Sequence, residues 1–207
     1  LANDGDGNYA YVDTLSQARR VFVENLTGML QVIAKDAKVQ VDFDPSVVSR
    51  YRLLGYENRR IADRDFRNDT VDAGEVGAGH TVTALYEIKL SDDVQGRIAT
   101  VYIRYQDPES GDVQEVSREF HWKEFATVFE EASPRFQLDA VVAEYAEILR
   151  ESFWAQESSL EQVSELAQRV NSLLSGDQDV EEFTGLVVQA GRIASSTANE
   201  TPIPDRR

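Results

Sequence analysis

The spacing of apolar residues changes twice along this chain, and this constrains the fold more than any other feature. From Leu15 to Ile33 apolar side chains recur every three or four residues, which predicts one long amphipathic helix. Over residues 36–125 the spacing is closer to two, as in half-buried strands. Beyond residue 126 the helical spacing returns. We therefore predict an α+β chain, with an antiparallel β-sandwich-like module between the long helix and a three-helix C-terminal subdomain.

Alternating apolar residues predict short strands, and glycine, proline and acidic residues separate them. The turn residues Pro108–Asp112 join the last two strands into a hairpin. Residues 57–79 are rich in charge and glycine and are predicted to be mostly loop. The predicted strands are Tyr9–Val12, Val39–Phe43, Val47–Tyr56, Thr81–Leu90, Ile98–Tyr105 and Val113–Trp122.

Helix-start signals divide the C-terminal part. Ser133 followed by Pro134 is typical of a helix start with proline at its first position. Two capping boxes predict two further helices, and a glycine ends the first of them. The boxes are Ser158 with Glu161 and Asp179 with Glu182, and the glycine is Gly176. The predicted divisions are residues 1–35, 36–125 and 126–200, with a flexible tail at 201–207.

Composition restricts the partners of the chain. Twenty-one basic and 37 acidic residues give a formal net charge of −16, which disfavours binding to nucleic acids and to anionic lipid surfaces. No cysteine is present, so disulfides, thiolate metal sites and cysteine nucleophiles are excluded. We expect a protein partner or other domains of the same protein, and no membrane contact by this chain itself.

The opening segment has the alternating acids of a calcium loop. Asp4, Asp6 and Asn8 match the first ligand positions of an EF-hand. Its sixth position should be glycine and its twelfth glutamate, but these positions hold Tyr9 and Leu15. We interpret the segment as a flexible turn before a strand.

A second acidic loop, Asp63–Asp72, also departs from the calcium pattern, because Arg67 occupies the third ligand position. Whether it binds an ion stays open. Arginines are concentrated around this loop, and they form a hypothetical interaction patch for an acidic partner or domain. The alternative is local salt bridging with neighbouring acids. The patch residues are Arg50, Arg52, Arg59, Arg60, Arg64 and Arg67.

The motifs of common catalytic sites are missing from the sequence. There is no Gly-x-Ser-x-Gly elbow and no His-Glu-x-x-His helix. The glycines at 74–79 precede a predicted strand, whereas a phosphate loop precedes a helix. His80 and His121 are far apart in sequence, and neither has a second histidine nearby. We therefore predict no enzyme activity, no catalytic residue, and neither a cofactor nor a metal site in this chain.

Two long blocks resemble a known family. Residues 7–45, GNYAYVDTLSQARRVFVENLTGMLQVIAKDAKVQVDFDP, resemble the end of a von Willebrand factor type A (VWA) domain. Residues 51–88, YRLLGYENRRIADRDFRNDTVDAGEVGAGHTVTALYEI, are similar to the uncharacterised domain that follows it in bacterial VWA proteins. Residues 138–152, LDAVVAEYAEILRES, resemble a further block of the same domain. The resemblance implies that residues 1–35 hold the last strand and helix of the VWA domain, whose metal motif Asp-x-Ser-x-Ser is absent here.

The resemblance implies an extracytoplasmic protein of the cell envelope, with a role in adhesion or assembly and a signal or lipid anchor upstream. We expect a non-catalytic interaction or scaffold module that is coupled to the VWA domain through the short connection Ala34–Ala37. The alternative is a carbohydrate- or peptide-binding sandwich with Tyr102, Tyr105 and Trp122 along a groove, unless these rings lie in the core. A third hypothesis is a hydrolase without a recognisable motif, which would require two close carboxylates in a deep pocket. The apolar stripe Leu15–Ile33 must be covered by the β-module, the C-terminal helices, or a second copy in a homodimer.

Overall fold

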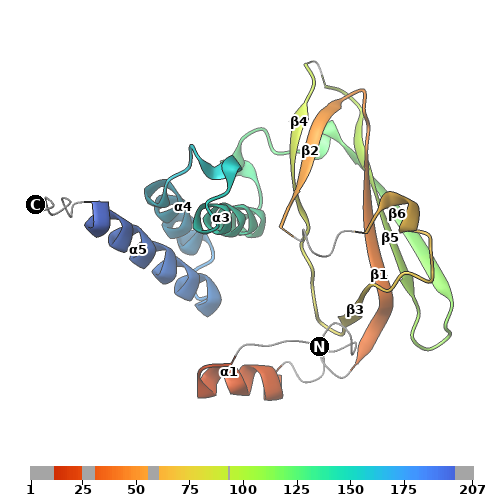
Figure 1. The fold of residues 1–207 in the computed structure, drawn as a ribbon, viewed down its shortest axis with the longest axis horizontal. Coiled ribbons are helices and arrows are strands. Elements are labelled where there is room, and N and C mark those ends of the chain that lie inside the picture. The colour runs from red at the N-terminus through yellow and green to blue at the C-terminus, as the bar shows by residue number, and fades with distance from the viewer. Residues whose placement is uncertain (1–11, 25–30, 56–60, 93, 199–207) are drawn as a thin grey trace, which may run out of the picture. The chain divides into compact units, whose positions relative to one another are not determined.

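The computed structural model describes residues 12–24, 31–55, 61–92 and 94–198 (Figure 1). The chain divides into two compact units, Leu1–Glu124 and Phe125–Arg207. Unit 1 holds the antiparallel sheets and unit 2 the long helices, which confirms the predicted α+β class. The predicted turn at Asp4–Asn8 and the tail at 201–207 lie outside the described residues, as does nearly all of the strand predicted at Tyr9–Val12.

Unit 1 contains a four-stranded sheet in the order β3-β1-β5-β6 and a two-stranded sheet of β2 and β4. Every neighbouring pair is antiparallel. The strands of the larger sheet are β1 (Val32–Phe43), β3 (Gly74–Gly77), β5 (Arg97–Gln106) and β6 (Val113–His121). The smaller sheet consists of β2 (Val48–Leu54) and β4 (Leu85–Leu90).

The predicted hairpin is confirmed by β5 and β6. Its turn is closed by Asp107, whose carboxylate accepts hydrogen bonds from the backbone N–H groups of Glu109 and Ser110, both at 2.9 Å. These bonds lower the pKa of Asp107, with the Ser110 amide as the main cause. Gly111 follows at φ +75°, a left-handed conformation that favours glycine.

An aromatic cluster joins the two sheets. Phe43 of β1 lies 4.5 Å from the ring centroid of Tyr51 in β2 and 5.4 Å from that of Tyr86 in β4. Ala99, which pairs with Phe43 across β1 and β5, is buried, as are its neighbour Ile98 and Val48 at the start of β2. This contact places the small sheet against the face of the large sheet that carries Phe43.

The predicted helix from Leu15 to Ile33 is wrong at its end, and its residues 25–30 lie outside the described part of the chain. Helix α1 covers Leu15–Arg19 and continues as a π-helical turn over Arg20–Glu24, whereas β1 already begins at Val32. Val32 pairs with Gly77 of β3, so tertiary pairing overrides the helical spacing. The connection predicted at Ala34–Ala37 is likewise part of β1 and not a linker.

Between residues 57 and 90, one unpredicted strand and one later strand start also differ from the prediction. The segment 57–79, predicted as mostly loop, contains β3 and a 3-10 turn at Asp63–Asp65. The strand predicted from Thr81 begins only at Leu85. Glycines form both ends of β3 and have low strand propensity, so its pairing with the first residues of β1 has no local signal.

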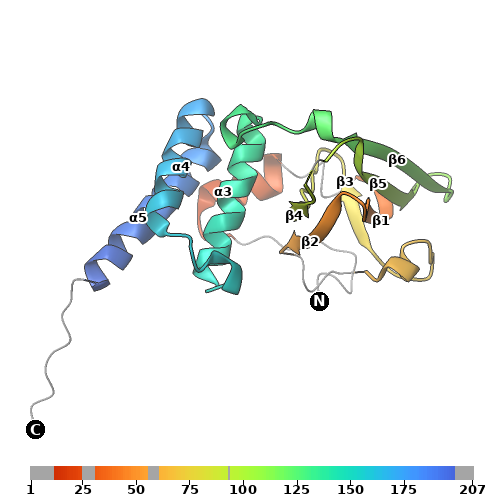
Figure 2. The same ribbon diagram turned by 90° about the horizontal axis from the view of Figure 1, so that it is seen from above.

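Unit 2 consists of three long helices, α3 (Pro134–Leu149), α4 (Leu160–Leu173) and α5 (Gln178–Ala198). Helix α4 contacts both of the others (Figure 2). Small and β-branched side chains form the buried core between them, namely Val141, Val163, Ala167, Val170 and Val187. Among the described residues, no helix is both long enough and apolar enough to cross a membrane.

The caps of α3 and α4 fix where these helices begin. Ser133 caps α3 as predicted. The capping box of α4 is formed by Ser159 and Gln162, one residue later than the predicted box at Ser158. Ser158 instead donates a hydrogen bond to the carboxylate of Glu144.

Helix α5 begins from Asp177 and not from the predicted box at Asp179 and Glu182. The Asp177 carboxylate accepts from the backbone N–H of Asp179 at 3.1 Å and of Val180 at 3.4 Å. Gly176, at φ +88°, reverses the chain just before this cap, close to its predicted place at the end of α4.

Candidate functional site

The two faces of the four-stranded sheet carry different chemistry. Side chains alternate along each strand, so the residues paired across β1, β5 and β6 form rows on one face. Lys38, Arg104 and Glu115 form one such row and define the polar face. Val39, Ile103 and Val116 form the adjacent row on the opposite side, which we call the apolar face.

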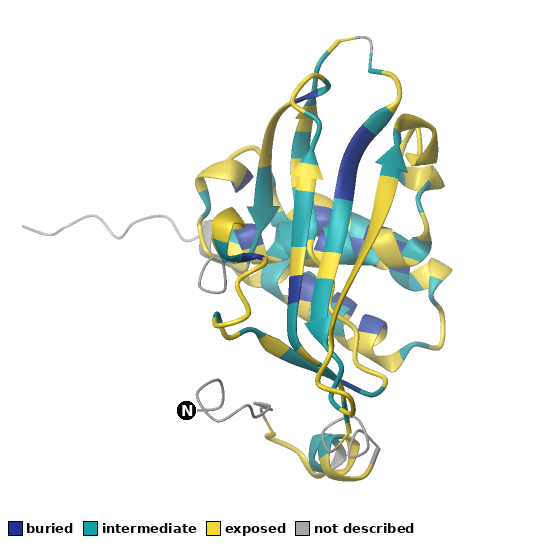
Figure 3. Ribbon diagram, turned by 90° about the vertical axis from the view of Figure 1, so that its right-hand side faces the viewer, coloured by how far each residue is buried: buried dark blue, intermediate teal, exposed yellow. Residues whose placement is uncertain are grey.

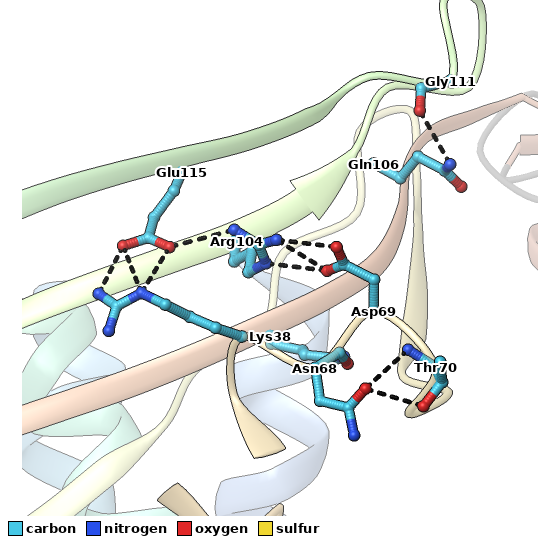
Figure 4. Close-up of polar contacts among 9 residues, drawn as sticks. Lys38, Asn68, Asp69, Thr70, Arg104, Gln106, Gly111 and Glu115 are labelled. Carbon is cyan, nitrogen blue, oxygen red and sulfur yellow. Dashed lines mark hydrogen bonds and ion pairs between the residues drawn. The ribbon is translucent and has the colours of Figure 1, made fainter. Parts of the chain in front are cut away.

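A charged cluster of Arg67, Asp69, Arg104 and Glu115 lies on the polar face. Figure 4 labels Asp69, Arg104 and Glu115 of this cluster. Arg67 Nη2 lies 2.7 Å from Glu115 Oε1. Arg104 bridges both acids, with Nη2 at 2.8 Å from Asp69 Oδ1 and Nη1 at 3.3 Å from Glu115 Oε2. Arginine and carboxylate therefore alternate through the cluster, and each charge has a partner of opposite sign.

These contacts also fix the protonation of the cluster. The hydrogen bond from Arg67 lowers the pKa of Glu115, and the same bond raises the pKa of Arg67. The hydrogen bond to Asp69 is the main cause of the raised pKa of Arg104. The two arginines and Glu115 are thus charged near neutral pH, so none of them is poised to transfer a proton there.

The cluster ties the loop of residues 61–73 to the sheet. Phe66 of this loop is only 3% exposed and meets Tyr102 of β5 edge to face, at 6.4 Å between ring centroids. The guanidinium of Arg67 lies over both rings, at 5.6 Å and 5.7 Å from their centroids. Lys38, 3% exposed, donates from Nζ to the carbonyl oxygen of Asn68 at 2.7 Å.

A β-bulge in β1 supports the far end of this loop. Lys35 pairs with Gln106 and Lys38 with Arg104, so β1 has one residue more than β5 between these pairs. Asp36, inside the bulge, has φ +47°, and its carboxylate accepts a hydrogen bond from the backbone N–H of Ala73 at 3.0 Å. The bulge thus turns an acidic side chain towards the loop.

A small cavity lies next to the charged cluster. Its volume is about 50 Å³, whereas pockets for small organic ligands usually measure ~300–1,000 Å³. It is therefore much smaller than a typical pocket for a small organic ligand. Its lining residues are Asp36, Lys38, Asp69, Arg104, Tyr105, Gln106 and Val113.

Two aspartates of the acidic loop Asp63–Asp72 pair with arginines, one from β5 and one from the loop itself. Asp69 contacts Arg104, and Asp65 lies 3.7 Å from Arg64. Within the described part of the chain, no group of three or more histidine, aspartate or glutamate residues is placed to hold a metal ion.

The arginines of the predicted patch belong to different parts of unit 1. Arg50 and Arg52 lie on β2, where Arg52 contacts Glu87 of β4 at 2.6 Å. Arg64 and Arg67 lie in the loop over the polar face. The remaining members of the patch, Arg59 and Arg60, lie outside the described residues.

The predicted local ion pairs are found only in part. Arg64 contacts its neighbour Asp65, but the partners of Arg52 and Arg67 are distant in sequence. Sequence spacing therefore could not predict that Arg104, Glu115 and Lys38 contact the loop, because only strand pairing brings them there.

The apolar face carries a row of exposed aliphatic side chains. Val39, Ile103 and Val116 are 55%, 40% and 52% exposed, and they lie directly opposite one another on β1, β5 and β6. The smaller sheet packs near Phe43, farther along the same face. Alternation in the sequence indicates an apolar face, but only the structure shows that this row is uncovered.

The aromatic groove of the alternative prediction is not formed by the residues named for it. Tyr102 packs against Phe66 on the polar face. Tyr105 is three residues farther along β5 and therefore points to the opposite face. Trp122 follows β6 in a 3-10 turn.

Comparison with known proteins places the chain in a family of C-terminal domains. It belongs to the family described as "Uncharacterized protein YfbK, C-terminal", whose model matches residues 28–97 and 89–193. YfbK of Escherichia coli (strain K12) is 34% identical over 188 residues, which is 82% of this chain and 32% of that relative. The chain thus spans about a third of the relative's length. No solved structure matches the chain.

This membership confirms the C-terminal domain part of the resemblance. The matched residues include both the block at 51–88 and the block at 138–152. The association with a VWA domain is not part of the family's description and stays a prediction.

Proposed function

We propose that this chain is a non-catalytic protein-interaction module that binds another domain of its own protein through the apolar face. The row of Val39, Ile103 and Val116 is the observation that supports this proposal. Three aliphatic side chains in register, each at least 40% exposed, form a continuous stripe across three strands. Such stripes favour contact with another protein surface.

The chemistry of the row suits a protein partner better than a small ligand. Covering the exposed part of each side chain contributes about 1 kcal/mol. A flat aliphatic stripe offers neither the concavity nor the convergent polar groups that fix a small molecule. On the opposite face the charges are already paired with one another, which favours a structural role for the charged cluster.

We further propose that the partner is a VWA domain in an extracytoplasmic protein of the cell envelope. Two observations support this part of the proposal. Residues 7–45 resemble the end of such a domain, and the relative from Escherichia coli is about three times as long as the region that the chain matches. A metal-dependent site in the VWA domain would then lie outside this chain.

The test is a calorimetric titration of this chain with the separately expressed upstream region of its parent protein. We expect saturable binding that Ile103→Asp abolishes. Val82→Asp is the matched control, because Val82 is an aliphatic residue of unit 1 that is 70% exposed and lies outside the sheets. Circular dichroism of each variant verifies that it is folded.

Absence of binding at concentrations up to about 1 mM, or equal binding by Ile103→Asp and wild type, would refute the proposal. Repeating the titration with and without Mg²⁺ tests the coupling to a metal-dependent domain. If the affinity does not change with Mg²⁺, the proposed binding between domains still stands, but its coupling to a metal-dependent domain is excluded.

A further inference from the structure

We infer that two copies of this chain pair through the outer edges of their β6 strands and so join their four-stranded sheets into one. This contact uses the strand edge and is separate from the binding of another domain on the apolar face. β6 is the last strand in the order β3-β1-β5-β6, so β5 pairs with one of its sides only. Within the described residues, no strand pairs with its other side.

The outer edge of β6 is long and accessible. The strand has nine residues, contains no proline, and is exposed from Val113 to Glu119 (Figure 3). An edge of this kind presents unpaired backbone N–H and C=O groups and is a template for another strand. A second copy of β6 always presents an edge of the same length.

Symmetry restricts how two β6 strands can pair. Antiparallel pairing about a two-fold axis places one residue opposite its own copy, and its neighbours pair symmetrically around it. Axes at Glu115 or Arg118 place two like charges face to face, and an axis at Ser117 places Glu115 opposite Glu119. Like charges directly opposite each other destabilise a strand pair.

An axis at Val116 avoids every such conflict. Val116 then lies opposite its own copy, Gln114 opposite Arg118, and Glu115 opposite Ser117. In this register the apolar row also continues across the axis, because Val116 is its outermost member. The row Val39, Ile103 and Val116 would meet its own copy end to end and form one stripe across both sheets.

Cysteine cross-linking tests the register directly. The natural chain has no cysteine, so Val116→Cys introduces a unique thiol. Side chains directly opposite in neighbouring strands have Cβ atoms about 5 Å apart, close to disulfide geometry. We expect mild oxidation to convert Val116→Cys into a covalent dimer.

Gln114→Cys is the matched control, because Gln114 faces Arg118 of the other copy. The two cysteines introduced at position 114 would be separated by four residues, about 13 Å along the strand. We expect this variant to stay uncrosslinked. Equal cross-linking of both variants, or of neither, would overturn the inference.

Charge substitutions at Ser117 provide a second test by analytical ultracentrifugation. In the proposed register Ser117 faces Glu115 of the other copy, twice per dimer. Ser117→Lys should lower the dissociation constant about fivefold and Ser117→Glu should raise it about fivefold. An axis at Ser117 predicts instead that both variants weaken the dimer.

The Ser117 variants lie on the polar face and leave the apolar row unchanged, so their effects are separable from those of Ile103→Asp. A wild-type chain that sediments as a monomer up to about 1 mM overturns the inference while leaving the proposed domain contact untouched.

Discussion

Phe66 provides a direct test of whether the 61–73 loop is part of the core of unit 1. Its ring is 3% exposed and packs against Tyr102, so the loop supplies a core residue to the sheet. Replacement by alanine removes this ring from between the loop and β5. If the loop were only a surface connection, the substitution would have little effect.

The expected loss is about 3 kcal/mol of unfolding free energy. Truncating a buried aromatic side chain to alanine lowers the unfolding free energy by ~3–5 kcal/mol in protein cores. We expect the lower end, because a loop can settle partly into the space that the ring leaves. The unfolding free energy of a small domain falls by about 2 kcal/mol per molar urea, so this loss should lower the urea midpoint of unfolding by about 1.5 M.

Tryptophan fluorescence separates the two units in this experiment. The chain has two tryptophans, Trp122 in unit 1 and Trp154 in unit 2. In a Trp154→Phe background the signal therefore reports unit 1. Phe22→Ala is the control, since this ring is 61% exposed and should leave the midpoint within about 0.3 M of the parent. A fall of less than about 0.5 M for Phe66→Ala would refute the reasoning.

Three further predictions concern charge and helix ends. Arg67 lowers the pKa of Glu115 in the folded state. The ionised carboxylate therefore stabilises unit 1 fully above the usual glutamate pKa, near 4.3. This stabilisation is lost as the pH falls through the lower pKa that Glu115 has in the folded state. Urea midpoints measured from pH 6 down to pH 3 should fall less steeply for Glu115→Gln than for wild type. Gly176→Ala forces a side chain into φ +88° and should cost unit 2 about 1–2 kcal/mol, measured by Trp154 fluorescence in a Trp122→Phe background. In the same background Ser159→Ala, which removes the cap of α4, should cost about 1 kcal/mol.

The elements with strong local signals could be predicted from the sequence. The hairpin of β5 and β6 has alternating residues and a turn-forming aspartate, and α3 begins at a serine followed by proline. Elements that depend on distant partners could not. The first residues of β1 fit a helical spacing as well as a strand, and only their pairing with β3 decides between the two.

The candidate site shows the same limit. Sequence spacing found Arg67 and Asp69 but not their partners, because Glu115 is 48 residues from Arg67 and Arg104 is 35 residues from Asp69. The sequence also could not predict that Val39, Ile103 and Val116 are exposed. Alternation predicts which residues share a face, but the extent of the smaller sheet determines which of them stay uncovered.

The direction of the strands has a mechanical consequence. β1 and β6 both run antiparallel to β5, so they point the same way, and the chain enters the sheet at the start of β1 and leaves it at the end of β6. Tension applied through the two flanking segments would pull these strands past each other along their length. The hydrogen bonds on both sides of β5 would then bear the load together in shear, and the sheet would resist extension instead of unzipping bond by bond.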